Sequence, residues 1–136
     1  MRRYVIASHG DLAKGCGVTL RMFVPELSNV TFLSGYGPED DIEADVKRYF
    51  ASLPPEDEVV VLTDLMGGSV NSLFLPYMSE RVHLVAGFNL ALVLELLSMG
   101  AEEPLTEQLL ESVENAKSGI VYLNNHSVQF SADDDV

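Results

Sequence analysis

The spacing of hydrophobic residues changes along the chain, and each change marks an expected element. A short apolar run predicts a first strand over residues 3–8, ended by His9 and Gly10. From Asp11 the apolar residues recur every three or four positions, which predicts a helix that Asp11 caps and that ends before Pro25. The chain therefore opens with a strand followed directly by a helix.

The same alternation continues along the chain. Ser69 is expected to cap one of the later helices, and Pro76 to kink or end it. Further strands are expected at residues 30–33, 59–62, 82–86 and 120–123, and helices at 39–53, 69–78, 90–99 and 104–117.

Strands that alternate with helices indicate an α/β fold with a doubly wound, mostly parallel sheet, because such units connect by right-handed crossovers. The flavodoxin-like strand order 2-1-3-4 is one arrangement of this kind and makes the first and third strands neighbours. A length of 136 residues suits one domain. We assign that domain to residues 1–125 and expect the polar, acidic residues 126–136 to be disordered.

Composition and charge narrow the function classes. The chain has no run of 18 apolar residues, and its N-terminal apolar run is too short for a signal peptide. The single cysteine, Cys16, cannot form an internal disulfide, so a cytoplasmic protein without membrane insertion is expected. A net charge of -13 disfavours nucleic-acid binding and favours a partner with a basic face, although the same charge also serves solubility alone.

Candidate chemical groups follow three of the expected strands. His9 follows the first strand, Asp64 and the turn Gly67-Gly68-Ser69 follow the third, and Asn89 follows the fourth. Ligands of open α/β sheets bind at the carboxyl ends of the strands, near the switch in strand order. In the order 2-1-3-4, His9 and Asp64 would meet at that point.

A histidine beside a carboxylate suits nucleophilic chemistry. The carboxylate accepts a hydrogen bond from one ring nitrogen, which fixes the tautomer and leaves the other nitrogen free to attack. The turn Gly67-Gly68-Ser69 lets backbone N–H groups approach an oxyanion, and a helix that starts there favours negative charge. These parts fit phosphoryl transfer, in which catalysis is mostly positioning and charge stabilisation.

Plainer interpretations apply to each residue taken alone. A histidine after a strand is often an ordinary loop residue, Asp64 can cap a turn, and glycine pairs often precede helices. His83 lies inside an expected strand and His126 in the tail, so both are left out of the candidate site. Cys16 falls on the apolar face of a helix and is assigned to the core.

Three segments together resemble the mannose-type IIA domains of the bacterial phosphoenolpyruvate-dependent sugar phosphotransferase system (PTS). They are VIASHG at residues 5–10, LTDLMGGSVN at 62–71 and VAGFNL at 85–90. Their order and spacing agree with that family over the whole chain except the tail. Val70 departs from the commonest pattern, in which many members have proline.

The resemblance implies a phosphoryl carrier in sugar uptake. His9 would take a phosphoryl group from the phosphocarrier protein HPr and pass it to a histidine of a IIB protein. Asp64 would orient His9, while Ser69 and the glycines Gly10, Gly67 and Gly68 would hold the phosphoryl oxygens, without a metal or other cofactor. The family is dimeric, which implies a homodimer whose C-terminal strand lies antiparallel on the partner's sheet. Because no IIB domain follows in the sequence, a free-standing IIA protein is expected.

Three other functions remain open. A histidine-phosphatase-like hydrolase also has His-Gly after its first strand, but it places arginine before the histidine, where this chain has Ser8. A IIA-like regulatory module could have the same residues at the site, so only a transfer assay or the neighbouring genes would separate it. A dihydroxyacetone-kinase phosphodonor domain has a similar fold but is expected to lack the Gly-Gly-Ser turn. None of these residues indicates the sugar.

Overall fold

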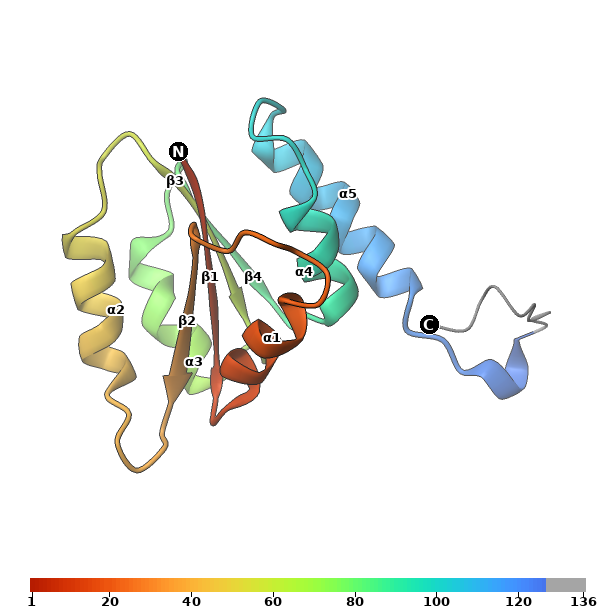
Figure 1. Cartoon of the computed structure of the whole chain (residues 1–136), viewed down its shortest axis with the longest axis horizontal. Helices are drawn as coiled ribbons and strands as arrows, with labels where there is room; N and C mark the ends of the chain where they lie inside the picture. Colours follow the sequence, from red (N-terminus) through yellow and green to blue (C-terminus); the bar gives the residue numbers. More distant parts are fainter. Residues whose placement is uncertain (127–136) are drawn as a thin grey trace.

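The computed structural model describes residues 1–126, which form a four-stranded sheet covered by helices (Figure 1). Its strands run in the order β2-β1-β3-β4, and all three neighbouring pairs are parallel. The expected α/β class and strand order 2-1-3-4 are therefore confirmed. The strands are β1 (Arg2–His9), β2 (Val30–Gly35), β3 (Glu58–Thr63) and β4 (Val82–Ala86).

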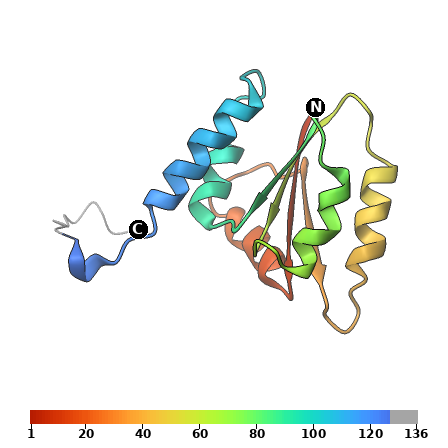
Figure 2. The same ribbon diagram turned by 180° about the vertical axis from the view of Figure 1, so that it is seen from behind.

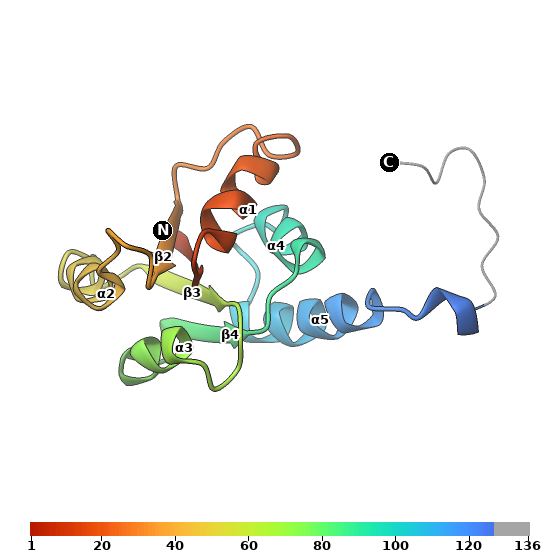
Figure 3. The ribbon, with the colours of Figure 1, turned by 90° about the horizontal axis from the view of Figure 1, so that it is seen from below.

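Helices cover both faces of the sheet, as the view from below shows (Figure 3). The helices α1 and α4 lie on one face, α2 and α3 lie on the other, and α5 packs against α4. Within residues 1–126, no helix is both long enough and apolar enough to cross a membrane. The helices are α1 (Leu12–Leu20), α2 (Ile42–Ala51), α3 (Ser69–Phe74), α4 (Leu90–Leu97) and α5 (Leu105–Ser118), with 3-10 turns η1 (Leu75–Tyr77) and η2 (Leu123–Asn125).

Alternating side chains of the central strands build two cores. In β1, Tyr4 and Ile6 point into the core under α1, α4 and α5, while Val5 and Ala7 point into the core under α2 and α3. In β3 every residue of 59–62 is buried, as the apolar run predicts for a strand with helices on both faces. The two cores hold β1 and β3 rigidly at the centre of the sheet.

Two helices begin differently from the prediction. Asp11 occupies the N-cap position of α1 but makes no side-chain capping bond, because the Ala13 N–H donates to the Ser8 hydroxyl instead (2.7 Å). The helix α2 starts later than expected, at Ile42, because the side chain of Asp41 accepts from the Ala44 N–H (3.2 Å) and caps it there. In both cases a polar side chain outside the apolar pattern sets the first turn.

The third helix also differs at its start. Ser69 is the first residue of α3 and not its cap, since Gly68 takes the N-cap position without a capping side chain. At the other end α3 stops at Phe74, and Pro76 lies in the following 3-10 turn η1, as expected of a proline late in a helix.

The expected strand at residues 120–123 is wrong for the single chain. Residues 120–122 have no regular structure, and the 3-10 turn η2 follows them. A strand requires a neighbouring strand, and the segment after α5 leads away from the sheet (Figures 1 and 2). Ile120 is 76% exposed and Leu123 53%. The expected acidic tail, apart from His126, lies outside the described residues.

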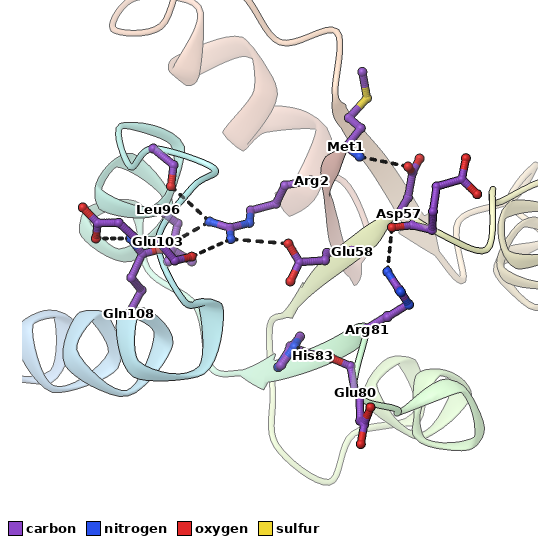
Figure 4. A network of polar contacts seen from close by, with 12 residues as sticks. Met1, Arg2, Asp57, Glu58, Glu80, Arg81, His83, Leu96, Glu103 and Gln108 are labelled. Atoms are coloured by element: carbon purple, nitrogen blue, oxygen red, sulfur yellow. Dashed lines mark hydrogen bonds and ion pairs between the residues drawn. The ribbon is translucent and has the colours of Figure 1, made fainter.

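A buried arginine joins the first strand to the loop between α4 and α5 (Figure 4). The side chain of Arg2 is only 4% exposed. Its guanidinium donates to the carbonyls of Gly100 (3.3 Å) and Glu103 (3.0 Å), to Gln108 (3.2 Å) and to Glu58 (3.4 Å). This network lies at the amino-terminal end of β1, opposite the end that carries His9.

Candidate functional site

His9 and Asp64 lie together at the carboxyl edge of the sheet. The parallel register pairs Ala7 of β1 with Thr63 of β3, so Asp64 follows β3 at the level where β1 ends in His9. The Asp64 Oδ2 atom accepts two hydrogen bonds of 2.9 Å from His9, one from the backbone N–H and one from Nδ1 of the ring. The pairing of the neighbouring strands β1 and β3 therefore brings His9 and Asp64 into contact.

The Asp64 carboxylate determines which nitrogen of the His9 ring carries the proton. Burial raises the pKa of Asp64, whose side chain is 9% exposed, but the backbone and ring hydrogen bonds from His9 outweigh that and lower the pKa below its ordinary value. An ionised carboxylate can only accept hydrogen bonds, so the proton between the two groups is on Nδ1. In the neutral ring, Nε2 of His9 is therefore the nitrogen that carries the lone pair.

The glycine-rich turn after β3 brings a hydroxyl to that lone pair. Ser69 Oγ lies 3.1 Å from Nε2, and its O–H can donate to that nitrogen when the ring is neutral. Gly67 has a positive φ of 74°, which a side chain would disfavour, and a Cβ on Gly68 would lie 3.3 Å from Cε1 of His9. The two glycines thus allow the turn and the ring to approach closely.

Buried contacts hold this turn in place. Thr63 at the end of β3 donates to the side chain of Asn71 in α3 (2.7 Å). Val70 is fully buried in the core under α2 and α3. Gly10 has a positive φ of 56°, and its N–H donates to the Gly35 carbonyl (2.8 Å). The roles of Gly10 and Gly67 toward a phosphoryl group stay predictions.

The residues after β4 support the fold, and within residues 1–126 none of their hydrogen bonds goes to His9. Gly87 has a positive φ of 84° and turns the chain. The Asn89 side chain caps α4 by accepting from the Leu92 N–H (2.9 Å), and its amide donates to the Ala116 carbonyl of α5 (3.3 Å). The third segment of the resemblance therefore fixes the start of α4 against the end of α5.

The other two histidines lie apart from the site. Nε2 of His83, in β4, contacts the carbonyl of Glu80 at an exposed position (3.1 Å). His126 is an exposed residue after η2. Within residues 1–126, no group of three or more His, Cys, Asp and Glu side chains is placed to hold a metal ion.

Sequence reasoning missed one residue at the site. The ring of Tyr36 stacks on His9, with ring centroids 5.6 Å apart and planes inclined by 30°. Tyr36 follows β2, which neighbours β1 on the side away from Asp64. The available signal was the sequence Gly-Tyr-Gly at the end of β2, because glycines on both sides of a residue favour a tight turn.

Comparison with known proteins places the chain in a family. Residues 3–114 match the mannose-type IIA family model (EIIA-man), which is described as the PTS system fructose IIA component. The PTS fructose-specific EIIA component of Bacillus subtilis is 29% identical over 100 residues, which are 70% of this chain and 68% of that protein.

Two solved structures have both the fold and substantial identity. A sugar PTS permease protein of Klebsiella pneumoniae is 35% identical with a TM-score of 0.83, covering 91% of this chain and 92% of that one. The PTS IIA protein associated with the fucose utilization operon of Streptococcus pneumoniae is 34% identical with a TM-score of 0.76, covering 90% and 93%. The predicted resemblance is confirmed, and this chain belongs to the mannose-type IIA component family of the sugar phosphotransferase system.

Proposed function

We propose that His9 carries a phosphoryl group that it receives from phosphorylated HPr and passes to a IIB protein. The observation that supports this most directly is the state of the His9 ring. Its Nδ1 is held by Asp64, and its Nε2 faces Ser69 with a lone pair. A nucleophile fixed by a carboxylate beside a hydroxyl donor is suited to accept a phosphoryl group and to release it again.

The step is an exchange of one N–P bond for another. The Nε2 lone pair of His9 attacks phosphorus, and the bond from phosphorus to the histidine of HPr breaks, returning its electron pair to that ring. The His9 ring becomes cationic, and the Asp64 carboxylate stabilises that charge. The Ser69 hydroxyl loses its acceptor at Nε2 and turns to donate to a phosphoryl oxygen. Transfer to IIB reverses this sequence.

The surface around His9 fits a protein partner. The His9 side chain is 38% exposed, so its ring is reached from outside the fold. Leu12 at the start of α1, and Leu65 and Met66 on the loop after β3, expose large apolar side chains in the segments that follow the two strands. Exposed apolar groups beside a reactive side chain are typical of protein interaction sites. A chain with a net charge of -13 would favour a partner with a basic rim.

Assembly as a homodimer is part of this proposal. In this fold β4 is an edge strand, and a groove of about 580 Å³ runs between it and α5. The exposed apolar side chains of Ile120, Val121 and Leu123 have the chemistry to fill such a groove. The C-terminal segment of one subunit would lie antiparallel on β4 of the other, which closes an open sheet edge in each.

Residues 1–125 would be the working unit of this carrier, acting in the cytoplasm. The relatives include a fructose-specific component and a protein associated with fucose utilization, so we do not assign a sugar. A regulatory IIA-like module and a dihydroxyacetone-kinase phosphodonor are the alternatives. The first differs from a transport component by not passing the group to IIB.

Reconstitution tests the proposal. The assay would mix this chain with enzyme I, HPr and a panel of IIB proteins of the mannose type. Phosphoenolpyruvate with a labelled phosphoryl group would start the reaction, and the label on IIB would be measured. We expect labelled IIB only when the chain is present. A chain that becomes labelled but discharges to none of the panel would favour the regulatory alternative, and a chain that HPr never labels would contradict the proposed function.

A further inference from the structure

Tyr36 combines two unusual properties at one position. Within residues 1–126 it is the only non-glycine residue with a positive φ, at 65°. Its ring also stacks on His9, with centroids 5.6 Å apart. A bulky side chain rarely adopts the left-handed conformation, because its Cβ crowds the backbone. Such conformations persist where the surroundings impose them, and they cluster at functional sites.

The backbone on both sides of Tyr36 is fixed. Gly35 pairs with His9 in the sheet register, and its carbonyl accepts from the Gly10 N–H (2.8 Å). On the other side, the Asp40 side chain accepts from the Gly37 N–H (3.0 Å), and the Asp40 N–H donates to the Gly37 carbonyl (3.1 Å). The chain must cross between two anchored glycines in one residue, so the left-handed turn falls on Tyr36.

The Asp40 carboxylate ties the same loop to the first helix. Its Oδ1 atom lies 3.8 Å from Nζ of Lys14 in α1. The loop that carries Tyr36 is therefore held from β2, from its own turn and from α1. The tyrosine ring is placed over His9 by these contacts and not by burial, since the residue is 59% exposed.

The ring of Tyr36 contacts the face of the His9 ring, which the other site residues do not. Asp64 bonds Nδ1 of His9, and Ser69 bonds Nε2. Two hydrogen bonds at the edge of the ring hold its nitrogens, but each bond tolerates moderate angular deviations and so resists a tilt of the ring plane only weakly. A group against the face of the ring limits this tilt, and Tyr36 is such a group.

We propose that Tyr36 is a positioning residue for His9, whose ring holds the plane of the imidazole so that the Nε2 lone pair points at the incoming phosphorus. This inference rests on the proposed function. It assigns the effect to the aromatic face and not to the phenol hydroxyl. It also predicts that removing the ring slows the chemical step more than it weakens the binding of the phosphoryl donor.

Three variants test it by single-turnover phosphoryl transfer from phosphorylated HPr, in which kcat is the limiting rate constant and KM the HPr concentration that gives half of it. Tyr36→Phe keeps the ring, and Tyr36→Asn removes it with a residue that tolerates the left-handed conformation. Met22→Asn, at an exposed apolar residue beyond the end of α1, is the matched control. We expect Tyr36→Asn to lower kcat roughly 10- to 100-fold, with KM nearly unchanged. Tyr36→Phe and Met22→Asn should behave as the wild type. A raised KM with unchanged kcat in Tyr36→Asn, or equal slowing in Tyr36→Phe, would overturn the inference.

A second measurement needs no phosphoryl donor. The ring current of Tyr36 shifts the proton resonances of the His9 ring, so these resonances should move in Tyr36→Asn and stay in place in Tyr36→Phe. Unchanged His9 resonances in Tyr36→Asn would overturn the stacking. If the wild type accepts no phosphoryl group while the resonances move as expected, the proposed function fails and the placement of the ring is supported. If the wild type is phosphorylated and Tyr36→Asn matches its kcat, only the positioning role fails.

Discussion

At the scale of single residues, one carboxylate oxygen of Asp64 accepts two hydrogen bonds that have different roles. Asp64 Oδ2 accepts from both the backbone and the ring of His9, while Oδ1 is buried and has no hydrogen-bond partner among residues 1–126. The first bond holds the end of β1, and the second orients the imidazole. Changing Asp64 should therefore affect the chemistry more than the packing.

We predict that Asp64→Asn slows phosphoryl transfer by a factor of ~10²–10⁴ without unfolding the chain. An amide fills the same space and still accepts a hydrogen bond, but it does not stabilise the cationic ring. Rapid-quench transfer kinetics measure the rate, and circular dichroism checks the fold. The matched control is Asp57→Asn, because Asp57 is also a mostly buried aspartate but lies at the other end of the sheet. An unchanged rate in Asp64→Asn would reduce Asp64 to a structural role.

Asp57 should make folding stability depend on acid pH. The hydrogen bonds from Arg3 and the N-terminal amine, at 2.6 and 3.0 Å, outweigh partial desolvation and lower its pKa. A carboxylate with a lowered pKa stabilises the folded state above its unfolded pKa, about 3.9, and loses this contribution as the pH falls through the folded pKa. Urea unfolding from about pH 5 to about pH 2 should show a smaller decline in the free energy of unfolding for Asp57→Asn than for the wild type. Equal declines in the free energy of unfolding for Asp57→Asn and the wild type would contradict this prediction.

How much of the site can be predicted from the sequence depends on the kind of contact. The proximity of His9 and Asp64 follows from strand order, which alternating strands and helices suggest but do not prove. Tyr36 and the capping hydroxyl of Ser8 could not be predicted in this way. Both act through the local path of the backbone, which hydrophobic spacing does not describe.

At the scale of elements, the apolar pattern located the helices and strands better than it located their ends. Strand β4 was predicted at residues 82–86 and begins and ends there. The helix α2 begins later than predicted because the side chain of Asp41 caps it. The strand expected at 120–123 failed for a different reason, since a strand depends on a neighbour that the sequence of one chain does not reveal.

The hydrogen bonds of Arg2 join β1 to the loop between α4 and α5, and their contribution to stability can be measured. Arg2→Met keeps the apolar stem but removes the donor to the carbonyls of Gly100 and Glu103 and to the buried side chain of Gln108. We expect a loss of about 3 kcal/mol in the free energy of unfolding, measured with urea. Arg48→Met, which breaks only an exposed ion pair in α2, should cost less than ~1 kcal/mol. Equal effects of the two changes would show that the buried network adds little.

At the scale of the whole molecule, the exposed segment after α5 is the feature that a single subunit leaves unexplained. Residues 119–126 are all exposed, and they include Ile120 and Leu123. Exposed apolar side chains of this size favour burial against another surface. The open edge of β4 and the groove beside it offer that surface in a second copy.

We predict that shortening the chain after Lys117 abolishes the dimer. Light scattering should report a dimer for a chain that ends after Asn125 and a monomer or aggregates for the shorter one, because the shorter one lacks the segment that would cover β4. A chain ending at Lys117 that remains a stable dimer would show that the segment does not hold the subunits together.

The most direct test of the whole account is to locate the phosphoryl group. The chain would be incubated with phosphoenolpyruvate, enzyme I and HPr, and its intact mass measured for the wild type, His9→Ala, His83→Ala and His126→Ala. We expect the mass of one added phosphoryl group in the wild type and in the last two variants, lost in acid and kept in alkali as an N–P bond requires. His9→Ala should gain nothing. Full phosphorylation of His9→Ala would contradict the account.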